Sequence, residues 1–341
     1  MNLFIPNTKI IKNYAPLNVD QIPDSIEEII HREKELTTMR YHFASVFSHE
    51  APRPLFIYGS SGTGKTVIVR VITKLLETTA ASEGINVFCP YVNCAISKSP
   101  FMIFKDLAEQ YSLKTKKPLL NLTNSATHQL NNFIEGLNAF DGISVIVLDE
   151  IDKSSSQDVM YALSRLMGNG KANKRVGLIC ISNDLKYTNT FDPRTLSSLA
   201  KKDIKLNPYN AEELADIISK RAELALYPNT YEEEVIPLCA ALTAKRDSDA
   251  RKAITLLHDA AETTEIRGLP EITGDIVREC ERTMRQELEV MEITKLPLQL
   301  KLTLASSIYG IHKSPSSKPT IAELYNTYIK ICKAVSAEPF K

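Results

Sequence analysis

Residues 55–66 read LFIYGSSGTGKT, a short apolar run followed by a glycine-rich loop. The run Leu55–Tyr58 has the composition of a buried strand, and the loop fits the pattern GxxxxGK[ST]. Apolar residues at helical spacing from Val67 to Thr78 predict a helix directly after the loop. A strand, such a loop and a helix in this order form the phosphate-binding loop (P-loop) of nucleotide-binding proteins.

The P-loop predicts how this chain binds phosphate. Its glycines let backbone N–H groups converge on phosphate oxygens, and the helix N-terminus adds a favourable dipole. Lys65 is expected to reach the β- and γ-phosphates, and Thr66 to bind Mg²⁺. The residues predicted to bind the nucleotide in this loop are Gly59, Ser60, Ser61, Gly62, Thr63, Gly64, Lys65 and Thr66.

A second part of the site follows the apolar run Ile143–Leu148, which ends in two acids, Asp149 and Glu150. Ligands of α/β sheets bind at the carboxyl ends of strands. Asp149 is therefore expected to bind the nucleotide's Mg²⁺ through water, and Glu150 to polarise the attacking water. A solvated strand end can show the same pattern, so the assignment depends on the P-loop upstream. The predicted ligands are ATP or ADP with Mg²⁺.

The rest of the chain predicts three regions. Apolar runs at Val87–Asn93, Ser144–Leu148 and Val176–Ser182 alternate with helical segments such as Phe101–Tyr111, which is typical of an α/β fold with a parallel sheet covered by helices. After Pro208 only helices are expected. They span Ala211–Leu224, Glu232–Ala244, Ala250–Arg267 and Ile272–Ile293. The predicted domains are a three-layer core at 1–206, an all-helical lid at 207–293 and a third region at 294–341.

Composition limits the class of protein, but it does not indicate which partner the protein binds. The 41 basic and 41 acidic residues balance, so there is no global electrostatic argument for nucleic acid. The six cysteines include no CxxC pair and no zinc-like spacing. No run of about 18 uncharged apolar residues exists, which predicts a cytoplasmic, intracellular protein without membrane contact.

Several further strings resemble those of one family, the archaeal initiators of the origin-recognition and cell-division-cycle type. These initiators are AAA+ ATPases with a C-terminal winged helix. The resemblance covers about residue 15 to the end. The matching strings are Pro23-Asp24, His31-Arg32-Glu33, Leu148–Asp152, Ile181–Asp184, Asp192–Leu199, Pro208–Leu214 and Ser248–Ala253.

The resemblance implies three more site residues. Asn183 corresponds to sensor 1, which bonds the γ-phosphate or the attacking water, although an Asn after a strand is also a common turn residue. Arg251 corresponds to sensor 2, which contacts the γ-phosphate from the lid helix, although without the surrounding string an arginine there would be interpreted as a solvated helix residue. Arg194 corresponds to an arginine finger offered to a neighbouring subunit, but an Asp-Pro-Arg sequence is equally consistent with an ordinary surface turn. Catalysis is thus assigned to Glu150, Asn183, Arg194 and Arg251.

Some positions depart from the family pattern. Ser248 stands where the family usually has Gly, although Ser is a favourable helix N-cap. Ala200 also replaces a common Gly. The segment Leu113–Asn132 is expected to carry the helical insertion typical of initiators.

The third region, from Lys295 on, resembles the winged-helix domain of the same family. Its predicted helices are Leu296–Lys301 and Ile321–Val335, and its seven lysines against two glutamates give a net charge of +5, which suits phosphate contact. A basic solvated hairpin would look similar. The sequence stops at Lys341, about where the recognition helix and β-wing are expected, so we predict an incomplete winged helix.

The function predicted from these features is that of an ATP-dependent DNA replication initiator. It would bind the double-stranded DNA of a replication origin, associate with the nucleoid, act with other initiator subunits or a helicase, and switch state on ATP binding and slow hydrolysis. The alternative is an AAA+ clamp-loader or remodelling ATPase that acts on a protein partner, with little affinity for bare duplex. A relative that holds ADP as a fixed structural ligand is a third possibility.

Overall fold

The computed structural model describes residues 9–23, 25–118, 125–154, 157–168, 175–187, 191–192, 199, 201–313 and 319–340. The chain divides into two compact units, Met1–Val277 and Arg278–Lys341. The first unit contains a parallel sheet with its covering helices, and a lid of three further helices. Short 3-10 helices in the first unit span Ala15–Leu17, Ile26–Glu28, Ala44–Ser48 and Ile151–Lys153.

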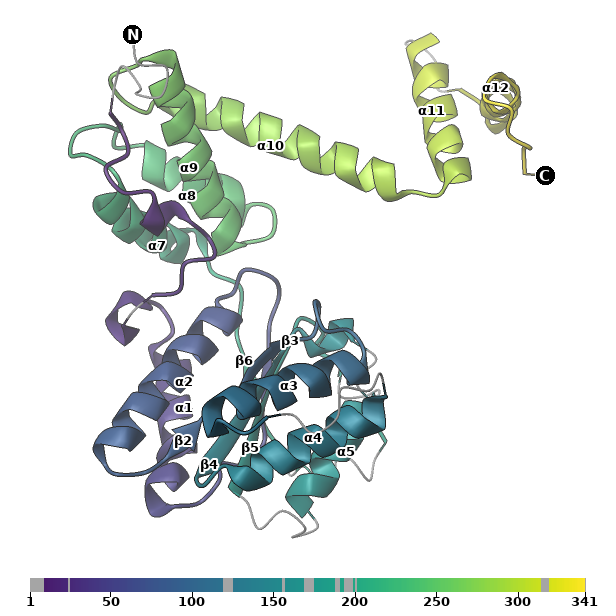
Figure 1. The fold of residues 1–341 in the computed structure, drawn as a ribbon. Helices are drawn as coiled ribbons and strands as arrows, with labels where there is room; N and C mark the ends of the chain where they lie inside the picture. The colour runs from purple at the N-terminus through teal and green to yellow at the C-terminus, as the bar shows by residue number, and fades with distance from the viewer. Residues whose placement is uncertain are drawn as a thin grey trace. The chain divides into compact units, whose positions relative to one another are not determined.

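The described strands form one parallel sheet in the order β2-β4-β5-β1-β6, and β3 also pairs with β4 (Figure 1). Their bounds are β1 Leu55–Tyr58, β2 Val87–Phe88, β3 Tyr91–Asn93, β4 Ile143–Asp149, β5 Arg175–Ser182 and β6 Lys202–Lys205. The expected parallel sheet is thus confirmed, including the pairing of β4 with β5. Because all strands run the same way, the P-loop after β1 and the acids after β4 lie at the same edge of the sheet.

Helices cover both faces of this sheet, as the α/β pattern predicted (Figure 1). One face packs on α1 Glu33–Phe43 and α2 Lys65–Ser82, and the other on α3 Pro100–Thr115, α4 Ala126–Ala139 and α5 Gln157–Gly168. Strand β1 shows why two cores form. Its side chains alternate, so Leu55 and Ile57 join the core under α1 and α2, whereas Phe56 and Tyr58 join the core under α3 to α5.

The lid consists of α7 Ala211–Ala225, α8 Val235–Ala244 and α9 Ala250–Arg267. The N-terminal segment, residues 9–23 and 25–32, lies against it, which the sequence did not predict. Ile11 forms an antiparallel bridge with Leu226, and the buried Glu265 carboxylate of α9 accepts hydrogen bonds from the N–H groups of Ile10 (2.8 Å) and Ile11 (2.9 Å). A buried carboxylate bonded by two backbone donors is satisfied, so it holds the segment in place.

The second unit contains most of α10 Gly274–Lys295, followed by α11 Leu298–Lys313 and α12 Ile321–Ala334. Its small core includes Leu302, Tyr328 and Cys332. Tyr328 donates a hydrogen bond to Gln299 Oε1 at 2.6 Å, which joins α12 to α11. None of the described helices is long and apolar enough to cross a membrane.

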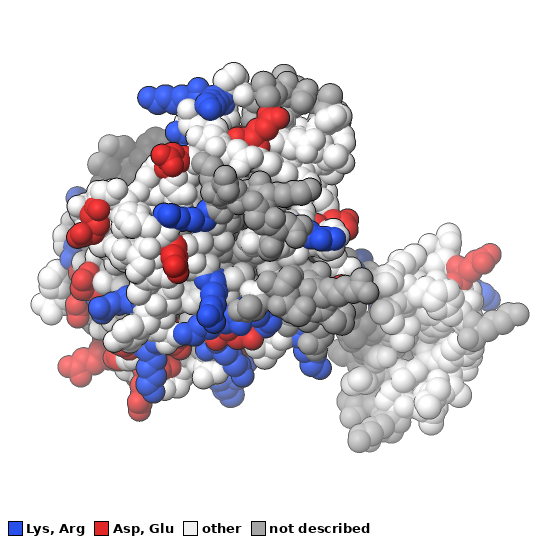
Figure 2. Space-filling model, turned by 90° about the horizontal axis from the view of Figure 1, so that it is seen from below, with Lys and Arg blue, Asp and Glu red and all other residues white. Residues whose placement is uncertain are grey.

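Figure 2 shows one face of the molecule. Over the first unit, Lys and Arg side chains lie interspersed with Asp and Glu side chains, and the surface of α11 and α12 is mostly uncharged. The described residues on this face therefore form no large patch of one sign, in keeping with the balanced charge of the sequence.

Several predicted boundaries were wrong for identifiable reasons. The run Val87–Asn93 is two strands, because Pro90 between them has no N–H for the ladder. The helix predicted from Ile272 begins at Gly274, since Ile272 forms a bridge with Tyr231. The strand β6 was not predicted, because only Ile204 of its four residues is buried at this edge position.

Three of the helices were not predicted as such. They are α1, α4 and α5. The insertion expected at Leu113–Asn132 overlaps the end of α3 and the start of α4, while its residues 119–124 lie outside the described part.

The start of α9 corrects the expectation for Ser248. The N-cap is Asp249, whose carboxylate accepts from the N–H of Arg251 at 2.9 Å. Ser248 instead has φ +54°, in the left-handed region that a glycine adopts without strain. This conformation explains why a glycine suits the position.

We expect Ser248→Gly to raise the free energy of unfolding by about 1 kcal/mol, because glycine relieves the left-handed strain at a smaller entropic cost. Urea denaturation of the full chain measures the effect. Ser248→Ala is the matched control, since it removes the hydroxyl but keeps Cβ in the strained conformation. Equal stabilities of the Gly and Ala variants would contradict this account.

Candidate nucleotide-binding site

The P-loop is packed so closely against its neighbours that Gly59 and Gly62 leave no room for a side chain. Gly62 and Gly64 have φ values of +72° and +88°. A Cβ atom on Gly59 would lie 2.6 Å from the carbonyl oxygen of Leu206, and one on Gly62 would lie 1.9 Å from Asp249 Oδ1. The glycines therefore allow both the loop conformation and the close approach of its neighbours.

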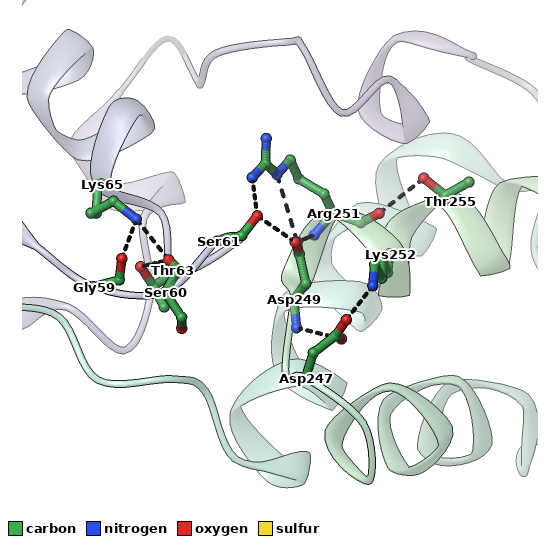
Figure 3. Close-up of polar contacts among 10 residues, drawn as sticks. All are labelled: Gly59, Ser60, Ser61, Thr63, Lys65, Asp247, Asp249, Arg251, Lys252 and Thr255. Atoms are coloured by element: carbon green, nitrogen blue, oxygen red, sulfur yellow. Dashed lines mark hydrogen bonds and ion pairs between the residues drawn. The ribbon is translucent and has the colours of Figure 1, made fainter. Parts of the chain in front are cut away.

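Lys65, the first residue of α2, is buried at the centre of this loop. Its ammonium donates hydrogen bonds to the carbonyl oxygens of Gly59 (2.8 Å) and Ser60 (2.6 Å) (Figure 3). Burial lowers the pKa of Lys65 to about 8, and the nearby Asp149 opposes that shift. Two carbonyl oxygens satisfy the Lys65 ammonium only in part. The ammonium is therefore well suited to bind anionic phosphate oxygens.

Asp149, at the end of β4, is 1% exposed and is the acceptor of a compact hydrogen-bond network. Its Oδ2 accepts from Thr66 Oγ1 and from Tyr91 Oη, each at 2.7 Å, and its Oδ1 accepts from the N–H of Glu150 at 2.8 Å. Burial and the Asp149 carboxylate raise the pKa of Tyr91, so its hydroxyl stays a donor. The Thr66 hydroxyl and the Asp149 carboxylate are hard oxygen donors, which suit Mg²⁺.

The other predicted catalytic residues of the core lie beside this network. Glu150 and Asn183 line the same cavity as Lys65 and Asp149. The Asn183 N–H donates to Asp152 Oδ1 at 2.9 Å, which fixes the turn after β5 next to the end of β4. Arg194, the predicted arginine finger, lies outside the described residues.

The lid brings its predicted arginine to the P-loop. Arg251 Nη2 donates to Ser61 Oγ at 2.6 Å, and Ser61 Oγ donates to Asp249 Oδ2 at 2.9 Å (Figure 3). Ser61 thus connects the P-loop to Arg251 of α9 and to Asp249, the N-cap of that helix. Every predicted site residue that the structure describes lies around one cavity or in the adjoining P-loop.

The cavity has a volume of about 630 Å³ and lies between the P-loop, the lid and the N-terminal segment. Its lining includes apolar residues beyond the predicted site residues. Ile22, Pro23 and Ile29 come from the N-terminal segment, and Ile217 and Ile254 from the lid. Mixed apolar and polar walls are typical of sites that bind a base together with its phosphates.

Arg32 is a further residue whose role was missed. It is 4% exposed, and its guanidinium donates to the carbonyl oxygens of Thr63 (3.1 Å) and Asn207 (2.8 Å) and to the hydroxyl of Tyr209 (3.1 Å). The guanidinium also stacks 3.8 Å from the centre of the Tyr209 ring. The string His31-Arg32-Glu33 is part of the family resemblance, but nothing in it indicates these partners.

Comparisons with known proteins agree with this geometry. Residues 28–179 match the model of an AAA ATPase domain, and residues 215–282 match the Cdc6 AAA+ ATPase-type lid domain. The chain is 34% identical to the ORC1-type DNA replication protein of Pyrococcus abyssi over 337 residues, which cover 97% of this chain and 78% of the relative. This chain belongs to the ORC1-type DNA replication protein family. The expected family and its AAA+ core and lid are thus confirmed.

Other family members support the same assignment. The ORC1-type DNA replication protein 1 of Sulfurisphaera tokodaii is 33% identical over 340 residues, covering 98% of this chain and 82% of the relative. The structure of Aeropyrum pernix ORC1 in complex with DNA matches with a TM-score of 0.76 and 30% identity, covering 97% of this chain and 84% of the other. This ORC1-type chain thus shares its fold as well as its sequence with the family.

We expect Arg32→Lys to lower the free energy of unfolding by about 2–4 kcal/mol, because an ammonium cannot bond three separate oxygens in the same plane and leaves buried acceptors unpaired. Urea denaturation measures the change. Arg40→Lys, on the exposed face of α1, is the matched control and should change stability by less than about 0.5 kcal/mol. Equal effects of the two changes would contradict the role given to Arg32.

Proposed function

We propose that this ORC1-type chain is an ATP-dependent initiator of DNA replication that binds the duplex DNA of an origin and changes state on ATP binding and slow hydrolysis. The observation that carries the proposal is the contact of lid residue Arg251 with P-loop residue Ser61. A nucleotide in this cavity would lie between lid and core, so its phosphates can alter how the two are joined.

We assign the phosphates to the P-loop residues 59–66, with Lys65 exchanging its two carbonyl partners for phosphate oxygens. Thr66 and Asp149 are the residues that would hold Mg²⁺, which supplies neutralisation of phosphate charge when bound. Glu150 orients and polarises the attacking water from the edge of the cavity. Asn183 and Arg251 respond to the γ-phosphate, and Arg194 is proposed as an arginine finger for a neighbouring subunit.

The base end of the nucleotide is assigned to the apolar side of the cavity. Ile22 and Pro23 from the N-terminal segment face the same space as Ile217 of α7 and Ile254 of α9. Because these residues come from the segment and from the lid, a bound base would strengthen their association.

We propose that DNA contacts are made mainly by the third domain. The domain limits follow the sequence prediction, namely a core at 1–206, a lid at 207–293 and a winged-helix domain at 294–341. Helices α11 and α12 fit helices of such a domain, and Lys301, Lys330 and Lys333 on them suit phosphate contact. The relative whose structure contains DNA supports this partner. Other initiator subunits and a helicase are proposed partners, and association with the nucleoid would follow from DNA binding.

We expect Glu150→Gln to lower the rate of ATP hydrolysis by about 100-fold or more while ATP affinity stays within about threefold, because the amide keeps the shape but cannot polarise water. The rate of phosphate release measures hydrolysis, and equilibrium titration with ATP measures the affinity. Glu109→Gln, on the exposed part of α3, is the control. A variant that hydrolyses ATP at the normal rate would remove Glu150 from the mechanism.

The proposed function is tested by the fluorescence anisotropy of labelled duplex DNA. Binding is measured with ATP, with ADP and without nucleotide across a salt series. We expect affinity that depends on the nucleotide and falls steeply with salt, because basic side chains displace counterions from the phosphates. Lys65→Ala should abolish the nucleotide dependence and leave the salt dependence.

Intact ATP binding with no duplex binding in any nucleotide state would argue against the initiator function and for an ATPase that acts on a protein partner.

A further inference from the structure

The N-terminus of lid helix α9 lies directly on the P-loop. The N–H of Ala250 donates to the carbonyl oxygen of Gly62 at 3.3 Å, and Asp249 Oδ2 accepts from Ser61 Oγ at 2.9 Å. Asp249 is 6% exposed, and the approach is so close that no side chain at Gly62 would fit. Lid and P-loop are therefore joined by a backbone bond and by the side-chain bonds of Ser61, which Figure 3 shows.

Arg251 takes part in the same contact. Its Nη2 donates to Ser61 Oγ at 2.6 Å, and its Nε lies 3.6 Å from Asp249 Oδ1. The Ser61 hydroxyl has one hydrogen, which it donates to Asp249, and its lone pairs accept from Arg251. Yet the Arg251 side chain is 55% exposed, so it can change partners at little steric cost.

We propose that Ser61 and Asp249 form a latch that engages Arg251 and thereby lowers the preference of this site for ATP over ADP. The proposal rests on the function assigned above, in which Arg251 responds to the γ-phosphate. The latch keeps α9 on the P-loop while the γ-phosphate position is empty, and the γ-phosphate of ATP releases it by taking Arg251.

The direction of the effect follows from the chemistry of the competing acceptors. A phosphate forms charge-assisted, often bidentate bonds with a guanidinium, and these are stronger than a bond to a hydroxyl. ATP binding must nevertheless separate Arg251 from Ser61 and from the Asp249 carboxylate. This separation lowers the net gain in binding free energy. ADP has no γ-phosphate and leaves the latch intact. The latch therefore reduces the affinity for ATP more than the affinity for ADP.

Ser61→Ala and Asp249→Asn test the latch. Asparagine is as good an N-cap as aspartate, so the second change removes the charge while it preserves the start of α9. Both should tighten ATP binding relative to ADP by about threefold to tenfold, the value of one lost hydrogen bond. Calorimetric titrations with ATP and ADP give this ratio. All variants carry Glu150→Gln, so that ATP is not consumed.

Two control variants remove similar groups outside the latch. Asp247→Asn neutralises a carboxylate whose Oδ2 pairs with Lys252 and whose Oδ1 accepts from the N–H of Asp249 at 3.4 Å, a bond that the asparagine oxygen can keep (Figure 3). Thr255→Val removes a hydroxyl of α9 that bonds only to the Arg251 carbonyl oxygen among the contacts drawn (Figure 3). Neither should change the ATP to ADP ratio by more than about twofold.

Two further measurements identify the mechanism. In an Arg251→Ala background, Ser61→Ala should no longer change the ratio, because the latch acts through this arginine. In the nucleotide-free protein, the amides of residues 247–252 should exchange hydrogen faster in Ser61→Ala than in the parent, because the lid is held less tightly.

The outcomes separate the latch from the function on which it rests. If Arg251→Ala lowers the ATP to ADP ratio but Ser61→Ala and Asp249→Asn leave it unchanged or lower it, Arg251 binds the γ-phosphate and the latch is wrong. If Arg251→Ala leaves the ratio unchanged while nucleotides still bind, the role assigned to Arg251 fails, and the latch fails with it.

Discussion

One buried guanidinium joins the segments that make the nucleotide site. Arg32 connects the N-terminal segment to Thr63 in the P-loop and to Asn207 and Tyr209, where the chain leaves the core for the lid. A buried charge is tolerated only when several acceptors satisfy it, and here those acceptors are contributed by segments that are far apart in sequence. The same side chain therefore fixes the P-loop, the N-terminal segment and the connection between core and lid relative to one another.

The parallel sheet concentrates the chemistry at one edge. Strand β1 ends in the P-loop, β4 in Asp149 and Glu150, and β5 in the turn of Asn183. Asp149 then ties these parts together, because its carboxylate accepts from Thr66 at the start of α2 and from Tyr91 on β3. The phosphate cradle and the acids are thus held by the sheet, whereas Arg251 is held by the lid. Such an arrangement makes the lid the part that can respond to the nucleotide.

The matched family models begin at residue 28 and so leave out most of the N-terminal segment, although this part also lines the cavity. This segment is bound to the lid by Glu265 and to the core through Arg32. It therefore connects the two parts between which a nucleotide would lie. The structure thus gives the segment a role in the site as well as in packing.

The sequence by itself determined the P-loop, the acids after β4, the α/β core and the bounds of α9, because each depends on neighbouring residues whose pattern is local. The tertiary structure alone decided that Thr66 and Tyr91 share Asp149, that Arg32 bonds Asn207, and that Asp249 reaches Ser61. The partners in these contacts are between 58 and 188 positions apart. A one-dimensional pattern contains no information on which distant donor will meet a given acceptor, because chain packing sets that choice. The catalytic roles of Glu150, Asn183, Arg194 and Arg251 and the three domain limits remain predictions.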